Sequence, residues 1–189
     1  MRLNLKRMIL ALAAVALLGT GSVFASPPVP SPDSSAYLSG RASTLLAEIQ
    51  EEAVGLGLNG ETLGTFAWNP QTSWQSHAFY LDRVKGHINA VGERAGELQR
   101  ISYAVLPWQQ QAISEVTSHA AQVAASTSAA IVHLRENQNR LFVPEYRDHL
   151  TTIAHRSEDL KQTVNKFLDY EKTQQKLHQL QNELELVGD

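Results

Sequence analysis

The sequence contains no cysteine, and this absence excludes several classes of protein at once. Disulfide frameworks, thiolate metal sites, iron–sulfur clusters and cysteine nucleophiles all need the missing side chain. Strand patterns are missing too, because no stretch after the first 25 residues alternates apolar and polar positions with β-branched enrichment. Since 43% of the residues are hydrophobic, we expect an all-α protein that is held together by its core.

Long apolar runs are also missing, except for one at the N-terminus. This run, Met8 to Leu18, follows three basic residues and leads through glycines to Val23-Phe24-Ala25, an order typical of a secretion signal. The sequence therefore predicts a signal peptide over residues 1–25, with export to the periplasm or the extracellular space. An uncleaved anchor is the alternative, although the run is short for a span of about 20 residues. We expect no stable membrane span after cleavage.

Positive charge is scarce in the predicted mature chain. Cleavage lowers the 16 basic residues to 13, against 19 acidic ones, which gives a net charge of −6. An acidic chain is a poor partner for nucleic acid, so we expect no nucleic-acid binding. Both methionines, Met1 and Met8, leave with the signal. Methionine–histidine haem ligation is thereby excluded, while bis-histidine ligation stays open.

Prolines divide the rest of the chain into four helical segments. Residues 26–34 hold four prolines and predict an extended linker. Pro70, Pro107 and Pro144 separate segments at about 35–67, 72–106, 107–140 and 145–187, each with apolar residues at steps of three and four. Short connections between long helices favour antiparallel neighbours. The predicted fold over residues 35–187 is therefore an antiparallel up-down-up-down bundle of about four long helices.

Glycines interrupt the first segment between Gly55 and Gly60. These letters match a G-x-G-x-x-G dinucleotide fingerprint, but that motif needs a preceding strand, which is absent. Leu56 and Leu63 keep the phase of the earlier apolar residues. We therefore predict one long helix that the glycines weaken. The third segment is rich in Ala, Ser and Thr, which allow close backbone approach, so we expect it to be the most buried helix or to contact another helix in an oligomer.

The fourth segment is about ten residues longer than the others. We expect its last part, about 171–187, to project from the bundle as a helical overhang with a leucine stripe. An unpaired apolar stripe favours a contact with another helix. The sequence therefore predicts a protein partner or self-association, and the alternative is a frayed C-terminus.

Four polar residues are expected to gather at one end of the bundle. In antiparallel hairpins with these turns, His77, His133, His149 and Glu61 fall at similar levels. Three imidazoles and a carboxylate suit zinc or copper. The alternative is that His77 is a hydrogen-bonded buried residue and the others are solvated. Neither Glu-x-x-His nor His-Glu-x-x-His occurs.

Motifs for catalysis are absent as well. There is no G-x-S-x-G nucleophile elbow, so we expect neither an enzyme nor a resident cofactor. The predicted function is that of an exported, non-enzymatic interaction or structural component of the cell envelope. The alternative is a periplasmic bundle that binds zinc or copper through the four residues above.

Overall fold

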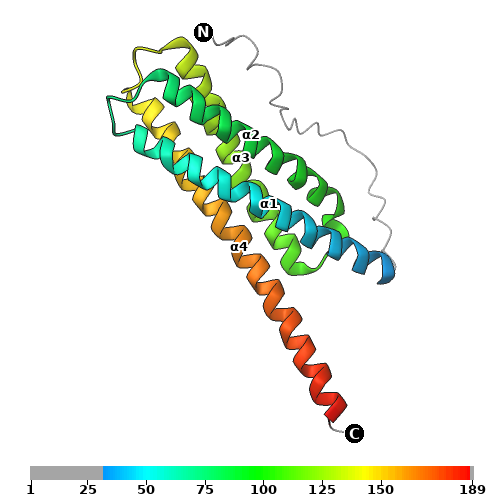
Figure 1. The fold of residues 1–189 in the computed structure, drawn as a ribbon. Coiled ribbons are helices and arrows are strands. Elements are labelled where there is room, and N and C mark those ends of the chain that lie inside the picture. Colours follow the sequence, from blue (N-terminus) through cyan, green and yellow to red (C-terminus); the bar gives the residue numbers. More distant parts are fainter. Residues whose placement is uncertain (1–31, 188–189) are drawn as a thin grey trace, which may run out of the picture.

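The protein is described by a computed structural model that covers residues 32–187, and all its regular elements there are helical. Its elements are α1 (Pro32–Phe66), α2 (Trp74–Ile101), the short 3-10 helix η2 (Ser102–Ala104), α3 (Pro107–Glu136) and α4 (Pro144–Val187) (Figure 1). The predicted all-α class with four long helices is confirmed for this part of the chain. The predicted signal peptide and residues 26–31 of the predicted linker lie outside the described residues.

Proline positions set several helix starts. α1 begins at Pro32 rather than after residue 34, so the predicted linker was too long by three residues. The reason is that proline fits the first turn of a helix, where its missing N–H is not needed. Pro107 starts α3 in the same way, as expected. There the Gln109 side chain accepts a hydrogen bond from the Leu106 N–H at 3.1 Å.

Two hydroxyl residues, Thr72 and Ser73, precede α2, and either type of side chain can cap a helix. Ser73, rather than Thr72, is the N-cap, and its hydroxyl accepts a hydrogen bond from Ser76 N at 3.3 Å. Ser73 has the extended backbone of an N-cap, with φ −70° and ψ 152°. Adjacent Thr and Ser offer the same chemistry, so the sequence could not choose between them.

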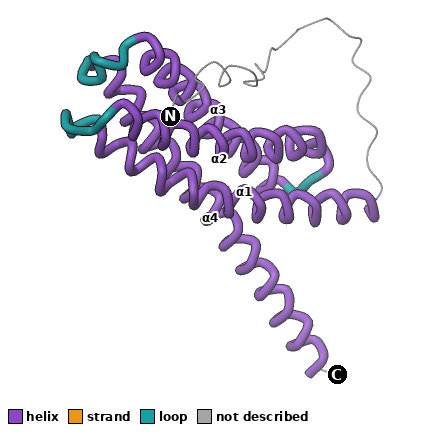
Figure 2. The backbone as a smooth tube through the Cα atoms, turned by 45° about the horizontal axis from the view of Figure 1, so that its top comes forward, coloured by secondary structure: helices purple, strands orange, loops and turns teal. Residues whose placement is uncertain are grey.

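Each long helix packs mainly against two others. α1 lies against α2 and α4, and α3 also lies against α2 and α4. The α1–α2 and α3–α4 connections lie at one end, and the α2–α3 connection lies at the other (Figure 2). Buried apolar residues from all four helices form one core in the space between them.

The core follows the predicted apolar stripes closely. The residues buried from Leu81 to Leu98 on α2 and from Ile113 to Leu134 on α3 follow steps of three and four, and α4 has buried apolar residues as far as Leu168. The largest fully buried apolar side chains are Leu45, Leu46, Ile49, Leu56, Leu63, Leu81, Leu98, Tyr146, Leu150, Ile153 and Leu160. Steps of three and four therefore identified the buried faces correctly.

Two glycines of α1, Gly60 and Gly64, lie close to α4. A Cβ added at Gly60 would lie 3.0 Å from Ser157 Oγ and 3.4 Å from the Ile153 carbonyl oxygen, and one at Gly64 would lie 2.9 Å from Ala154 Cβ. α1 is continuous here, so the prediction of one long helix is confirmed. The missing Cβ atoms at Gly60 and Gly64 let the backbones of α1 and α4 approach each other.

Two exposed glycines of α2 have no such contact, which gives a prediction about stability. A Cβ at Gly86 or Gly92 of α2 would meet nothing within 4 Å. Replacing either glycine by alanine is expected to stabilise the fold by about 1 kcal/mol, because alanine is the better helix former. Urea unfolding followed by circular dichroism measures the change. Unchanged or lower stability in both variants would contradict the open surroundings of these two positions.

Candidate functional site

A cluster of rings lies at the end of the bundle that holds the α1–α2 and α3–α4 connections. His77 near the start of α2 and Tyr146 near the start of α4 are both buried, and a 3.0 Å hydrogen bond joins His77 Nδ1 and Tyr146 Oη. The His77 ring centroid is 5.0 Å from that of Phe66. The His133 ring stacks on the Tyr146 ring, and their centroids are 4.8 Å apart. The cluster is thus a packed aromatic layer with one internal polar contact.

Burial controls protonation in this cluster. Desolvation lowers the pKa of His77 to about 4, because the charged imidazolium has no compensating anion there. Burial also raises the pKa of Tyr146 above its ordinary value. Both rings are therefore neutral near pH 7. Among the described residues, His77 Nε2 has no hydrogen-bond partner, and the hydrogen bond found for the ring is the one to Tyr146.

The structure brings together only part of the predicted metal cluster. His77 and His133 both contact Tyr146, whereas Glu61 is exposed on α1. Across residues 32–187, no group of three or more His, Cys, Asp or Glu side chains is placed to hold a metal ion. The residue numbers predict how far along the bundle each side chain lies, but not in which direction it points around its helix. That direction decides whether the donor atoms converge on one point.

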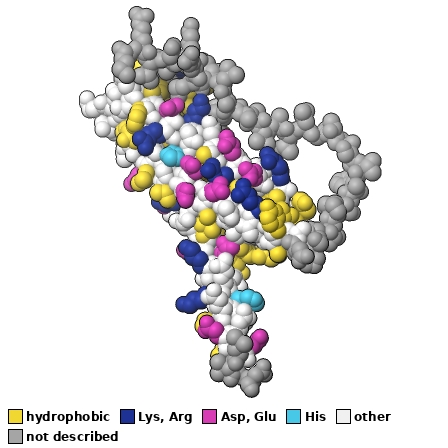
Figure 3. All heavy atoms as spheres, turned by 45° about the vertical axis from the view of Figure 1, so that its right-hand side comes forward, with side chains coloured by type: hydrophobic (Ala, Val, Ile, Leu, Met, Phe, Trp, Pro, Cys, Tyr) yellow, Lys and Arg dark blue, Asp and Glu magenta, His cyan; other side chains and the backbone are white. Residues whose placement is uncertain are grey.

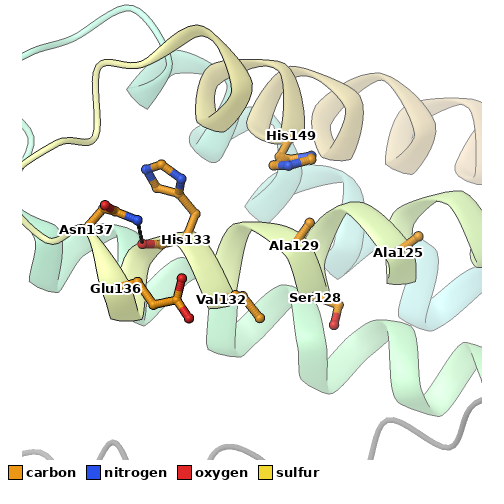
Figure 4. Close-up of a pocket in the computed structure, with 8 residues that line it drawn as sticks. All are labelled: Ala125, Ser128, Ala129, Val132, His133, Glu136, Asn137 and His149. Atoms are coloured by element: carbon orange, nitrogen blue, oxygen red, sulfur yellow. Dashed lines mark hydrogen bonds between the residues drawn. The ribbon is translucent and has the colours of Figure 1, made fainter.

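His133 and His149 share the edge of a shallow, open groove of about 630 Å³ between α3 and α4 (Figure 4). The Asn137 side chain donates a hydrogen bond to the His133 carbonyl oxygen at 3.3 Å, and His133 Nε2 lies 3.1 Å from the Arg140 carbonyl oxygen. The remaining residues that line the groove are Ala125, Ser128, Ala129, Val132 and Glu136. The His133 ring is thus held by the α3–α4 connection and by Tyr146.

The second candidate site is the C-terminal overhang, which we define as residues 172–185 of α4. Every residue in this range is exposed, and the helix leaves the body of the bundle alone (Figure 1). Leu177, Leu180 and Leu184 are 50%, 47% and 73% exposed. Their steps of three and four place them on one face. The overhang therefore presents an apolar stripe that no other residue between 32 and 187 covers.

The base of the overhang is fixed to the bundle. Trp108 at the start of α3 contacts Phe167 and Tyr170 of α4, with ring centroids 6.5 and 5.6 Å apart. The Ser43 hydroxyl of α1 bonds to the Glu171 carboxylate. The buried Gln109 side chain donates to Ser43 Oγ at 3.1 Å and to the Ser39 carbonyl oxygen at 2.9 Å. α1, α3 and α4 are tied together where the overhang begins.

Exposed apolar side chains also surround this base. Hydrophobic groups gather where the bundle meets the overhang (Figure 3). At the start of α1, in η2, in the α2–α3 connection and in α4, the exposed ones are Tyr37, Tyr103, Leu106 and Tyr170. The apolar surface of this end is therefore larger than the leucine stripe alone.

Sequence reasoning found the overhang but missed the role of Tyr146. Tyr146 lies on the apolar face of α4, and the sequence pattern alone gave it no polar role. The available signal was His77 itself, because a histidine on a buried face needs a polar partner. Near the start of α4, Tyr146 is the residue of the apolar face that carries a hydroxyl group.

No protein-family model matches the chain, and comparisons with curated proteins and with solved structures find no significant match. Over residues 32–187 the structure is that of an all-α protein with four packed helices, of which the last, α4, projects beyond the others. Among the described residues, no helix combines the length and hydropathy needed to cross a membrane.

Proposed function

We propose that this chain is an exported, non-enzymatic interaction protein that uses its C-terminal overhang to bind another helix. The observation that carries the proposal is the exposure of Leu177, Leu180 and Leu184 on one face of an isolated helix. Burial of such a face is favourable by about 25 cal/mol per Å² of apolar surface. A partner helix provides that burial, because it can fill the same heptad spacing.

The proposed architecture is an antiparallel up-down-up-down bundle that follows a signal peptide. The connections at alternating ends favour this order. So do the paired contacts between α1 and α2, where Phe66 meets His77 at one end and Arg41 bonds to Glu97 towards the other. Export is proposed from the basic and apolar pattern of residues 1–25.

A structural role for the ring cluster supports the non-enzymatic proposal. His77 is 1% exposed and Tyr146 is 0% exposed. A general base must come within hydrogen-bond reach of its substrate, and these two groups face each other inside the core. Their hydrogen bond serves packing rather than chemistry in this proposal.

Site-specific photocrosslinking in cells tests the interaction. We expect a photoreactive residue in place of Leu180 to crosslink the chain to a protein, either another protein or a second copy. The matched control replaces Asn182, which is also exposed but lies on the opposite side of the same helix. Equal crosslinking at both positions, or none at either, would overturn the proposed function.

A further inference from the structure

We infer that the overhang pairs with the overhang of a second copy of this chain, and that the two helices run antiparallel. This inference rests on the proposed function and names the partner. Its evidence is the placement of two opposite charges beside the leucine stripe.

The overhang has a heptad pattern that extends back into the bundle. If Tyr170, Leu177 and Leu184 are taken as a positions, Thr173 and Leu180 are d positions. Leu177, Leu180 and Leu184 are exposed, so no other part of the described chain covers them. Residues at a and d form the seam of a coiled coil, and the flanking e and g residues set the orientation.

The flanking positions carry a single positive and a single negative charge. Lys176 and Glu183 are both g positions, while the e positions are Gln174 and Gln181. Lys176 and Glu183 are exposed, and no ion pair of either appears among those found for the described residues. The edge that could bind a partner therefore carries separated charges of opposite sign on one side, and neutral amides on the other.

In an antiparallel pair, both of these charges meet a charge of opposite sign. Antiparallel coiled coils place a residues against d residues, and g residues against g residues. With Leu177 opposite Leu180 of the second copy, Thr173 lies opposite the second copy's Leu184. Lys176 then lies beside Glu183 of the second copy, and symmetry forms this ion pair twice. Gln174 and Gln181 meet on the other edge, where amides can bond to each other.

In a parallel pair, neither charge meets a charge of opposite sign. There each g residue faces an e residue of the second copy, so Lys176 would face Gln181 and no opposite charges would meet. The antiparallel pair also keeps the two bundles at opposite ends of the joint. Charge complementarity thus favours the antiparallel arrangement.

Charge exchange in the full processed chain tests the orientation. The stripe is short, and interfaces below about 1,200 Å² belong to the weak class. We therefore expect sedimentation velocity to show a monomer–dimer equilibrium whose dimer fraction rises with concentration. Lys176→Glu and Glu183→Lys each turn two attractive contacts into repulsive ones and should weaken the dimer about tenfold. The double variant restores the attraction and the wild-type dissociation constant.

Mixing gives a second readout of the same geometry. The Lys176→Glu chain and the Glu183→Lys chain should dimerise with each other better than either does with itself, because their mixed pair has two opposite-charge contacts. Matched control variants are Lys172→Glu and Glu185→Lys, which change the same charges on the outer side of the exposed helix. These controls should leave the dimer unchanged. Circular dichroism should show equal helix content in all variants.

Engineered thiols distinguish the two orientations directly, because the chain has no cysteine of its own. In the antiparallel pair, oxidation should join Thr173→Cys chains to Leu184→Cys chains and leave each variant alone uncrosslinked. Self-crosslinking of Thr173→Cys, a dimer that ignores the charge exchange, or a monomer at about 0.5 mM would each overturn the inference. A monomer that still crosslinks through position 180 to a different protein would leave the proposed function intact.

Discussion

Replacing Gly60 by leucine is expected to destabilise the protein by about 2–3 kcal/mol, which lowers the melting temperature by roughly 5–10 °C. The physical reason is the contact of α1 with α4. A Cβ at Gly60 would already lie 3.0 Å from Ser157 Oγ, 3.1 Å from Ser157 Cβ and 3.4 Å from a backbone carbonyl oxygen. A leucine has three more carbon atoms beyond that point, so the two helices must separate.

Gly57 offers the matched control for this experiment. It is also a buried glycine of α1, one turn earlier, but a Cβ there would first meet the flexible Lys161 side chain at 3.5 Å. Gly57→Leu should change the free energy of unfolding by less than about 1 kcal/mol, because the lysine stem can move and leucine favours the helix. Thermal and urea unfolding of the two variants give the comparison. Equal destabilisation would show that the α1–α4 contact at Gly60 is not the limiting one.

The protein is expected to lose stability on mild acidification through His77. Burial lowers the pKa of His77 to about 4 in the folded state, from 6.5 in an unfolded chain. The unfolded state therefore binds the proton first, and stability falls as the pH drops from about 6.5 towards 4. One pKa unit corresponds to about 1.4 kcal/mol, so the loss is about 2 kcal/mol at pH 5 and about 3 kcal/mol at pH 4.

A double variant isolates this contribution from that of the carboxylates. His77→Leu combined with Tyr146→Phe removes both partners of the buried hydrogen bond, and such paired replacement is close to neutral at pH 7. The single variant His77→Leu should cost about 1–3 kcal/mol, because the Tyr146 hydroxyl is left without its partner. Urea unfolding from pH 4 to pH 7 should give a shallower pH dependence for the double variant. Parallel curves for the double variant and the natural chain would contradict a neutral, buried His77.

The stripes and the breaks between helices were readable from the sequence because they depend on local chemistry. Prolines ended or began helices where expected, and apolar steps of three and four marked the buried faces. Helix boundaries differed by a few residues: α1 starts at Pro32, and α3 ends at Glu136 rather than near residue 140. The end of α3 depends on Asn137, whose φ of −134° and ψ of 45° leave the helical region, and nothing in the local pattern specified that turn.

Of the two candidate sites, the overhang could be predicted from the sequence and the ring cluster only in part. The overhang follows from helix length alone, since a segment longer than its neighbours must extend beyond them. The ring cluster depends on which way each side chain turns around its helix. His77 lies on a buried face, but Glu61 is exposed on α1, and the hydrogen-bond partner of His77 is Tyr146, which was not in the predicted set. Likewise, the small residues of α3 gave no hint that Gly60 and Gly64 of α1 would lie so close to α4.

The overhang has a further consequence because it is a helix that is anchored at its base by Trp108, Gln109 and Ser43. Its 14 residues (172–185) rise by about 1.5 Å each, so its reach from the bundle is fixed at about 20 Å. The overhang therefore sets the distance between the bundle and a bound partner as well as providing the contact surface. Each inserted or deleted residue would shift the tip by about 1.5 Å and rotate the stripe by about 100°, which couples the spacing of any bound body to the direction in which it faces.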